Sequence, residues 1–292
     1  MTSVSKSRLT PLPLNFCHDF LPERLYLSRL LEFAESSPRG TKLDIAQTTG
    51  IPTGNRSGKV EPMIGYATGM GLVESERHGE QWRLQLTSAG RTVRLEDPYL
   101  NESVTQWFAH LMLSRRAGLT LPAVGIADAW FTFYGDWTSR LSTQFSKESF
   151  IDLLSEKHGK KGYLKGLTGI VMRTYTEPTC LGLIKSFQQT EKAVISRVPS
   201  PIDRSLFPCY AAYLYLLWDE MFEGQQQILL NELLSQSRFQ TIMNWDDKHL
   251  EIWLDWLVTE RLIQLDRQTG EALGLRLQAT EYVISNMYSE LL

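Results

Sequence analysis

The turn at residues 53–59, with the sequence TGNRSGK, carries side chains suited to binding a phosphate group or the edge of a guanine. Arg56 and Lys59 supply two positive charges, and Ser57 adds a hydroxyl. Gly54 and Gly58 permit close approach of the backbone, and amides at the start of a following helix favour anions. We therefore expect DNA contact at this turn, with a solvated glycine-rich loop as the alternative.

A second stretch, EKHGKKGYLKG at residues 156–166, is the densest basic segment of the chain. Its basic side chains lie around glycines and Tyr163: Lys157, His158, Lys160, Lys161 and Lys165. Each lysine that reaches a phosphate contributes to salt-dependent affinity for nucleic acid, and Tyr163 can stack on an unpaired base. A flexible solvated loop is again the alternative.

Acidic and histidine side chains that could take part in strand cleavage are few and scattered. Metal-dependent cleavage requires clustered carboxylates that hold Mg²⁺ or Mn²⁺. The sequence has neither an HEXXH motif nor His-Asn-His nuclease spacing. The candidates are His18, Asp19, Asp97 and Glu102, and the metal ligands stay unassigned. Asp97 and Glu102 also suit a helix N-terminus, which favours acids, and His18 can be structural.

The first part of the chain predicts the elements that would position the turn. Apolar spacing predicts a helix over residues 21–35, a short helix after Thr41 with Leu43, Ile45 and Ala46 buried, and a third helix over residues 59–70. The alternation of Leu84 and Leu86 then predicts a hairpin, and Thr87 caps the next helix. This order is typical of a winged helix-turn-helix.

Two arginines of the predicted hairpin, Arg77 and Arg83, are further candidates for DNA contact. Three glutamates of the same segment oppose this interpretation: Glu74, Glu76 and Glu80. A phosphate-binding wing is usually more basic. The sequence therefore leaves open whether the hairpin contacts DNA or only completes the fold.

The last third predicts the same order of elements again. Helices are expected over residues 210–222 and 225–236 and from Asp246, followed by a hairpin at residues 262–277 and a final helix capped by Thr280. Between the two units, residues 101–116, 122–134 and 164–175 have helical spacing, and a further helix through Lys157 is expected to start at Ser146 or Ser149. We expect a mainly α protein with winged helix-turn-helix domains at residues 1–95 and 207–292 and a helical middle domain at residues 96–206.

Charge is divided unevenly among these three ranges. Residues 1–95 hold 12 Lys/Arg and 9 Asp/Glu, residues 96–206 hold 13 and 11, and residues 207–292 hold 5 and 13. The net charges of +3, +2 and −8 predict different partners for the two ends of the chain. The acidic range would be repelled by phosphate, so protein partners or scaffolding suit it better.

The overall composition is that of a cytoplasmic globular protein. The 292 residues include 42% hydrophobic and 22% charged residues. No apolar stretch approaches the roughly 20 residues needed to cross a bilayer, and the N-terminus has no secretory signal. The three cysteines form no CxxC pair and are expected to be reduced thiols.

Three segments resemble motifs of the SspB-like family of bacterial DNA phosphorothioation and phage-defence proteins. Residues 97–102, DPYLNE, are similar to the family's Asp-Pro-Tyr-Leu-Glu segment and precede a helix with Trp107 and His110. Residues 170–184, IVMRTYTEPTCLGLI, resemble its Phe-Leu-Arg-Thr-Tyr segment. FCHDF at residues 16–20 resembles its Gly-His-Glu-Thr-Phe segment but is one residue shorter, with Asp19 in place of Glu.

The resemblance implies a DNA-binding component of a phosphorothioation and anti-phage system, with DNA nickase activity and Mg²⁺ or Mn²⁺ as cofactor. Its expected partners are DNA and other proteins of the system, with self-association left open. The alternative is a non-catalytic winged-helix adaptor that docks partner proteins through its acidic C-terminal domain. A third hypothesis is an assembly protein whose winged helices bind only proteins.

Overall fold

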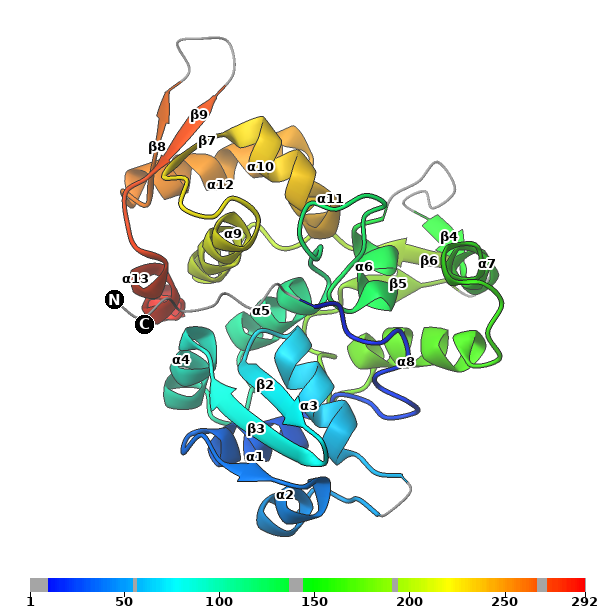
Figure 1. The fold of residues 1–292 in the computed structure, drawn as a ribbon. Coiled ribbons are helices and arrows are strands. Elements are labelled where there is room, and N and C mark those ends of the chain that lie inside the picture. The colour runs from blue at the N-terminus through cyan, green and yellow to red at the C-terminus, as the bar shows by residue number, and fades with distance from the viewer. Residues whose placement is uncertain (1–9, 55–56, 137–143, 191–193, 267–271, 292) are drawn as a thin grey trace.

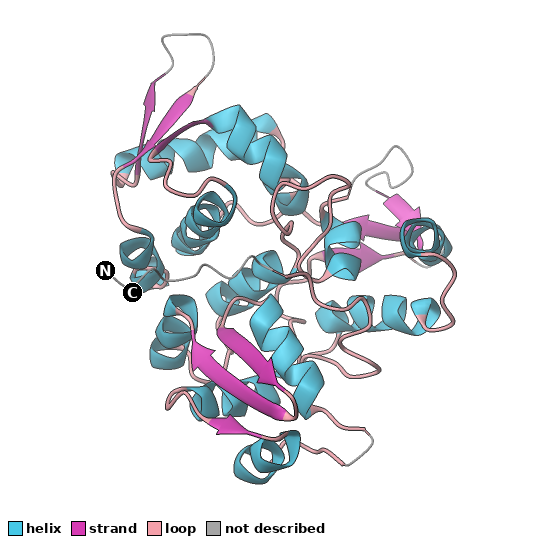
Figure 2. Ribbon diagram, viewed as in Figure 1, coloured by secondary structure: helices cyan, strands magenta, loops and turns pink. Residues whose placement is uncertain are grey.

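The structure is a computed structural model that describes residues 10–54, 57–136, 144–190, 194–266 and 272–291. The described chain is mainly α-helical, and its strands form three separate small antiparallel sheets (Figures 1 and 2).

The first part of the chain contains the expected helices and hairpin. Its elements are α1 Arg24–Ala34, β1 Arg39–Gly40, α2 Lys42–Thr49, α3 Val60–Gly69, β2 Val73–His78, β3 Gln81–Leu86 and α4 Ser88–Glu96. Thr41 and Asp44 form a reciprocal capping box at α2, and the Thr87 hydroxyl accepts a hydrogen bond from the Gly90 amide at α4. Side-chain caps of this kind stabilise a helix start by about 1 kcal/mol.

Burial in this part follows most of the predicted pattern. Leu84 and Leu86 lie in the core, as their alternation in β3 predicts. Ile45 of α2 is also fully buried, and Ala46 packs against the core. Leu43 was expected to be buried but is 47% exposed. Only one side of the two-turn helix α2 meets the core, and Leu43 lies outside that side.

The described middle of the chain has four helices, as the sequence predicts. It also has a small sheet that the sequence did not predict. The elements are α5 Ser103–Leu113, α6 Asp128–Tyr134, β4 Gln144–Ser146, α7 Lys147–His158, α8 Leu164–Thr176, β5 Phe187–Gln189 and β6 Val194–Arg197. The strands pair in the order β4-β6-β5. They are three or four residues long, too short for local periodicity to identify them, and the partner of β4 lies about fifty residues away in the sequence.

Helix α6 begins at Asp128 rather than near residue 122. The Asp128 carboxylate accepts a hydrogen bond from the Gly125 amide at 2.6 Å, which fixes the entry into the helix. The preceding chain is held by a bridge between Arg116 and Gly125. Residues 122–127 are therefore loop, although their apolar spacing is compatible with a helix.

The last part contains most of the expected helices and a third sheet. Its elements are η1 Arg204–Leu206, α9 Phe207–Met221, β7 Gln227–Leu229, α10 Leu230–Ser237, α11 Phe239–Met243, α12 Asp247–Thr259, β8 Ile263–Asp266, β9 Leu273–Arg276, α13 Thr280–Ser285 and η2 Ser289–Leu291. The sheet order β7-β9-β8 matches β1-β3-β2 of the first part. In both sheets, a short strand that precedes a helix pairs with the second strand of the hairpin: β1 with β3, and β7 with β9.

Two expectations for the last part need correction. Residues 227–229 form a strand, so the helix expected from residue 225 begins only at Leu230. Thr280 is the first residue of α13 rather than its cap, which is Ala279. The Thr280 hydroxyl instead donates to the Asp219 carboxylate at 2.5 Å, a bond that ties α13 to α9.

One contiguous hydrophobic core runs through all three parts. The last helix α13 packs on α9 and on α4, so the end of the described chain lies against its first part (Figure 1). Arg115 joins the parts through polar contacts. Its Nη1 donates to the Gly69 carbonyl at 2.7 Å, and its Nε lies 3.0 Å from the Glu220 carboxylate. The three predicted ranges, residues 1–95, 96–206 and 207–292, thus contribute side chains to one common core.

Candidate nucleic-acid interface

Helix α3, the helix in the position of a recognition helix, faces the protein interior. Of its ten residues, only Glu61, Gly65 and Thr68 are partly exposed. Even at Gly65, an added Cβ would lie 2.5 Å from the Phe16 ring. That ring packs edge-on against Tyr66 with centroids 4.9 Å apart. The segment before α1 therefore covers the side of α3 that would otherwise be free for a DNA groove.

The turn before α3 holds its lysine in an internal pair. Thr53 and Gly58 form a bridge that closes the turn. The Lys59 ammonium pairs with the Glu23 carboxylate and lies 4.7 Å from the centre of the Tyr26 ring. Ser57 is exposed, and Arg56 lies outside the described residues. Lys59 is therefore used to attach the turn to α1 rather than presented to solvent.

The arginines of the β2–β3 hairpin also have acidic partners. Arg77 lies 3.2 Å from Glu61 and over the Trp82 ring. Arg83 lies 3.7 Å from Glu76. Exposed pairs of this kind contribute little to stability, but they cancel the positive charge that a phosphate would meet. The hairpin is thus close to neutral.

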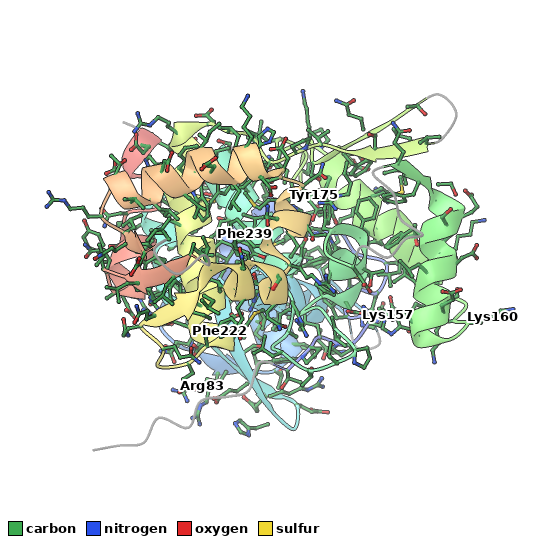
Figure 3. All side chains as sticks on the ribbon, turned by 90° about the horizontal axis from the view of Figure 1, so that it is seen from above. Arg83, Lys157, Lys160, Tyr175, Phe222 and Phe239 are labelled. Atoms are coloured by element: carbon green, nitrogen blue, oxygen red, sulfur yellow. The ribbon has the colours of Figure 1, made fainter. Side chains whose placement is uncertain are left out.

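The basic segment at residues 156–166 divides into one internal lysine and three exposed lysines. Lys157 donates to Asp128 at 3.0 Å and to Asp136 at 3.2 Å, and its side chain is only 15% exposed. Lys160, Lys161 and Lys165 are exposed. Figure 3 shows Lys160 at the outer edge of the molecule and Lys157 toward its interior. Only three of the four lysines are available to a phosphate.

The exposed lysines continue onto the outer face of α8. Lys165 and Arg173 are both exposed there and lie two helical turns apart. An added Cβ at Gly159, Gly162 or Gly169 would meet no atom within 4 Å. We call this surface the basic ridge: Lys160, Lys161, Lys165 and Arg173, together with Gly159, Gly162, Gly166 and Gly169. Arg173 was not among the DNA-binding residues predicted from the sequence. It follows Lys165 by eight residues, a spacing that places both on the same face of α8.

His18 and Asp19 lie beside this ridge. Phe16 and Cys17 are buried and anchor the segment, and burial raises the pKa of the Cys17 thiol to about 12. His18 and Asp19 are exposed, with His18 in the left-handed conformation at φ 50°. The position of a Cβ on Gly166 would be 3.9 Å from Asp19 Oδ1. The structure thus brings one predicted catalytic pair next to one predicted DNA-binding segment.

Asp97 has a structural role at the start of α5. Its carboxylate accepts hydrogen bonds from the amides of Asn101 and Glu102, each at 2.9 Å, and from the Thr105 hydroxyl at 2.6 Å. Asp97 is 5% exposed, whereas Glu102 is exposed. A buried carboxylate that already accepts three bonds has little capacity left to bind a metal ion.

Two of the segments that resemble family motifs meet in the core. His110 Nδ1 and the Tyr175 hydroxyl form a hydrogen bond at 2.8 Å, and both residues are buried. The Tyr134 ring lies 4.4 Å from the imidazole between ring centres. Burial, with a smaller effect of Arg197, lowers the pKa of His110 to about 3, so this imidazole stays neutral at physiological pH. These motif residues position α5 and α8.

The candidate residues do not converge on one surface. Arg83 and Lys160 lie at opposite edges of the molecule (Figure 3). Within the part of the chain that the structure describes, no three His, Cys, Asp or Glu side chains gather in a group able to hold a metal ion. The four catalytic candidates thus do not form a preassembled Mg²⁺ or Mn²⁺ site.

The fold and these surfaces define a mainly α protein with three small sheets and an exposed basic ridge. No helix among the described residues is both long and apolar enough to cross a bilayer. No family model matches the sequence, and a search of curated proteins gives no match. Solved structures, by contrast, do match this fold.

Two crystal structures of SspB share this fold. One, described as magnesium ion-bound SspB, has a TM-score of 0.72 and 13% identity, covering 98% of this chain and 90% of the other. The second, described as SspB, has a TM-score of 0.71 and 14% identity over the same shares. At this identity the likeness establishes an SspB-like fold, in agreement with the resemblance seen in the sequence.

Proposed function

We propose that the protein is the DNA-binding component of a bacterial DNA phosphorothioation and anti-phage defence system. The observation that carries this proposal is the SspB-like fold over 98% of the chain. The short motifs at residues 16–20, 97–102 and 170–184 support it independently, because they are features of the sequence alone.

The basic ridge is the proposed surface for DNA. Lys160, Lys161 and Lys165 are exposed, and no contact with an acidic side chain is found for them among the described residues. Arg173 pairs with Glu177 at 2.9 Å, but both side chains are exposed, so a phosphate can compete for the guanidinium group. The open glycines let a sugar–phosphate backbone approach closely.

The helix-and-hairpin units at the two ends are proposed to be winged helices that act mainly as a framework. In the first unit the segment at residues 12–20 covers α3. We therefore do not propose that α3 enters a DNA groove as a recognition helix. In the last unit the net charge of −8 over residues 207–292 favours protein partners. We therefore also propose that the acidic residues 207–292 dock partner proteins of the system, as in the adaptor hypothesis.

Strand nicking is the second candidate function, because one structure with this fold is described as magnesium ion-bound. The carboxylates described here do not gather into a magnesium site, so no metal-dependent step is assigned to them. Supercoiled plasmid incubated with Mg²⁺, Mn²⁺ or excess EDTA tests nicking directly. Open-circle product that requires metal would support a nickase whose metal site forms only with DNA.

DNA binding is tested by fluorescence anisotropy of a labelled duplex at several salt concentrations. Removing three phosphate contacts with Lys160→Ala/Lys161→Ala/Lys165→Ala should reduce the slope of log affinity against log salt by about 2.7. A control with the same charge change is Lys42→Ala/Lys185→Ala/Lys248→Ala, whose lysines lie outside the ridge. Equal slopes for the two triple variants, or no binding by the wild type near 50 mM salt, would refute the proposal.

A further inference from the structure

The loop between α5 and α6 carries apolar side chains that the fold leaves in solvent. Residues 119–122, with the sequence Leu-Thr-Leu-Pro, are all exposed, and we call them the apolar tip. Leu121 is 84% exposed, the highest value among the large apolar side chains that the structure describes, and Leu119 is 41% exposed. Adjacent apolar side chains in water lower the stability of the free protein, and they are typical of a surface that binds a partner.

Hydrogen bonds fix the conformation of this loop. The Ala117 amide donates to the Val124 carbonyl across the loop at 2.7 Å. The Arg116 guanidinium group, which is buried, donates to the Thr120 carbonyl at 2.9 Å and to the Gln236 carbonyl of α10 at 2.7 Å. A loop that is already ordered loses little conformational freedom on binding, so the apolar tip can enter a partner at a low entropic cost.

The foot of the loop is joined to the start of the basic ridge. The Gly125 amide donates to one oxygen of the Asp128 carboxylate at 2.6 Å. The other carboxylate oxygen lies 2.6 Å from Nε2 of His158, the last residue of α7. The exposed Lys160 and Lys161 of the ridge come directly after this helix end. The apolar tip therefore extends from a point next to the surface proposed for DNA.

A further cation lies near the other arm of the loop. The loop passes beside α11 (Figure 1), and the exposed Arg238 directly precedes that helix. Burial, with a smaller effect of the charge on Arg238, lowers the pKa of Arg116, so the two guanidinium groups lie near each other. Residues 117–127 contain no charged side chain. An apolar tip with lysines and an arginine near its foot suits nucleic acid better than a protein interface, where lysine is depleted.

We propose that the apolar tip is a wedge that enters a DNA base step and kinks the duplex, which rests on the proposed DNA binding. The basic ridge and Arg238 hold neighbouring phosphates of the same duplex. Leucine and proline are among the side chains that proteins insert between base pairs, and such insertion bends DNA by about 20–90°. Pyrimidine–purine steps such as TA unstack most easily, so the tip should favour a duplex that contains such a step.

The test compares two duplexes of identical composition, one with a TA step at its centre and one with AT there. Anisotropy measures affinity, 2-aminopurine beside the central step measures unstacking, and energy transfer between dyes on the two ends measures the bend. The variants are Leu119→Ala/Leu121→Ala and Leu121→Phe. The matched control is Leu95→Ala, whose side chain is 78% exposed on α4. Thermal unfolding shows that each variant is folded.

The wild type should bind the TA duplex more tightly than the AT duplex, with higher 2-aminopurine fluorescence and a shorter end-to-end distance in the complex. Leu119→Ala/Leu121→Ala should lose both signals and bind the TA duplex about tenfold more weakly. Leu121→Phe should keep them, because phenylalanine also serves as a wedge. Leu95→Ala should behave as the wild type. The ridge variant Lys160→Ala/Lys161→Ala/Lys165→Ala should weaken binding of both duplexes equally.

Three other results would overturn the wedge. Duplex binding by the wild type with no unstacking and no preference for TA would remove the wedge while leaving DNA binding in place. Self-association of the wild type that Leu119→Ala/Leu121→Ala abolishes, without a 2-aminopurine response, would assign the tip to a second copy of the chain. Failure of the wild type to bind either duplex at low salt would refute the proposed function together with the wedge.

Discussion

Replacing Arg115 by Met should destabilise the whole protein, because Arg115 contacts all three parts of the chain. Its guanidinium group is 3% exposed and donates to the carbonyls of Gly69 and Met112 and to the Glu220 carboxylate. The Glu220 side chain is only 15% exposed. Arg115→Met therefore leaves a largely buried carboxylate without its cation, along with two carbonyls that lose a donor.

The expected loss is about 3–5 kcal/mol in the free energy of unfolding, the usual cost of breaking a buried ion pair. An unfolding entropy of about 2.1 cal/mol/K per residue over 292 residues gives about 0.6 kcal/mol/K. The melting temperature should then fall by about 5–8 °C. Calorimetry at pH 7 measures both quantities, and urea unfolding provides an independent free energy.

Two further variants separate the ion pair from a general effect of substitution. Arg115→Met/Glu220→Leu should recover much of the loss, because apolar replacement of both members removes the unpaired charge. Arg173→Met breaks only an exposed pair with Glu177 and should cost below about 0.5 kcal/mol. If Arg115→Met lowers stability by less than about 1 kcal/mol, as for a surface pair, the reasoning about a shared buried hub is refuted.

Three other predictions concern charge and backbone exposure. Lys157→Met removes the partner of Asp128 and Asp136, so it should lower the melting temperature but leave the salt slope of DNA binding unchanged. Lys160→Met removes an exposed charge, so it should keep the melting temperature and reduce the salt slope by about 0.9. The reverse pattern would contradict the assignment of Lys157 as the internal lysine. Burial raises the folded pKa of Glu220 above its ordinary value of 4.5 despite Arg115, so folded protein binds this proton more tightly and stability should fall as pH rises above 4.5. Glu220→Gln should flatten that pH dependence in urea unfolding. Gly169→Ala should stabilise α8 by about 1 kcal/mol yet weaken duplex binding, and unchanged affinity would show that DNA does not approach this backbone.

Much of the local structure was predictable from the sequence. Capping residues such as Thr41 and Thr87 lie at the observed helix starts, and the alternation at Leu84 and Leu86 identifies the hairpin strand. These features depend on contacts within a few residues. The sheet of the middle part was missed because its strands are only three or four residues long, and because β4 pairs with a strand about fifty positions away, as Gln144 does with Ser196.

The candidate site was predicted less well than the helices. The basic segment at residues 156–166 was identified from its composition, but only the tertiary structure shows that Lys157 is used internally and that Arg173 extends the ridge. His158 was visible as part of the basic segment. Its partner Asp128 lies thirty residues away on another helix, and no local pattern links the two.

The sequence by itself determined the order of most helices, the capped starts of helices such as α2 and α4, the alternation in the first hairpin, and the division of charge along the chain. The tertiary structure decided which of those charges remain available. Lys59 and Lys157 have the same side chain as Lys160, yet carboxylates from distant elements neutralise the first two. The reason is physical: capping and periodicity act over one or two helical turns, whereas ion pairing and the covering of α3 by Phe16 depend on how distant segments pack.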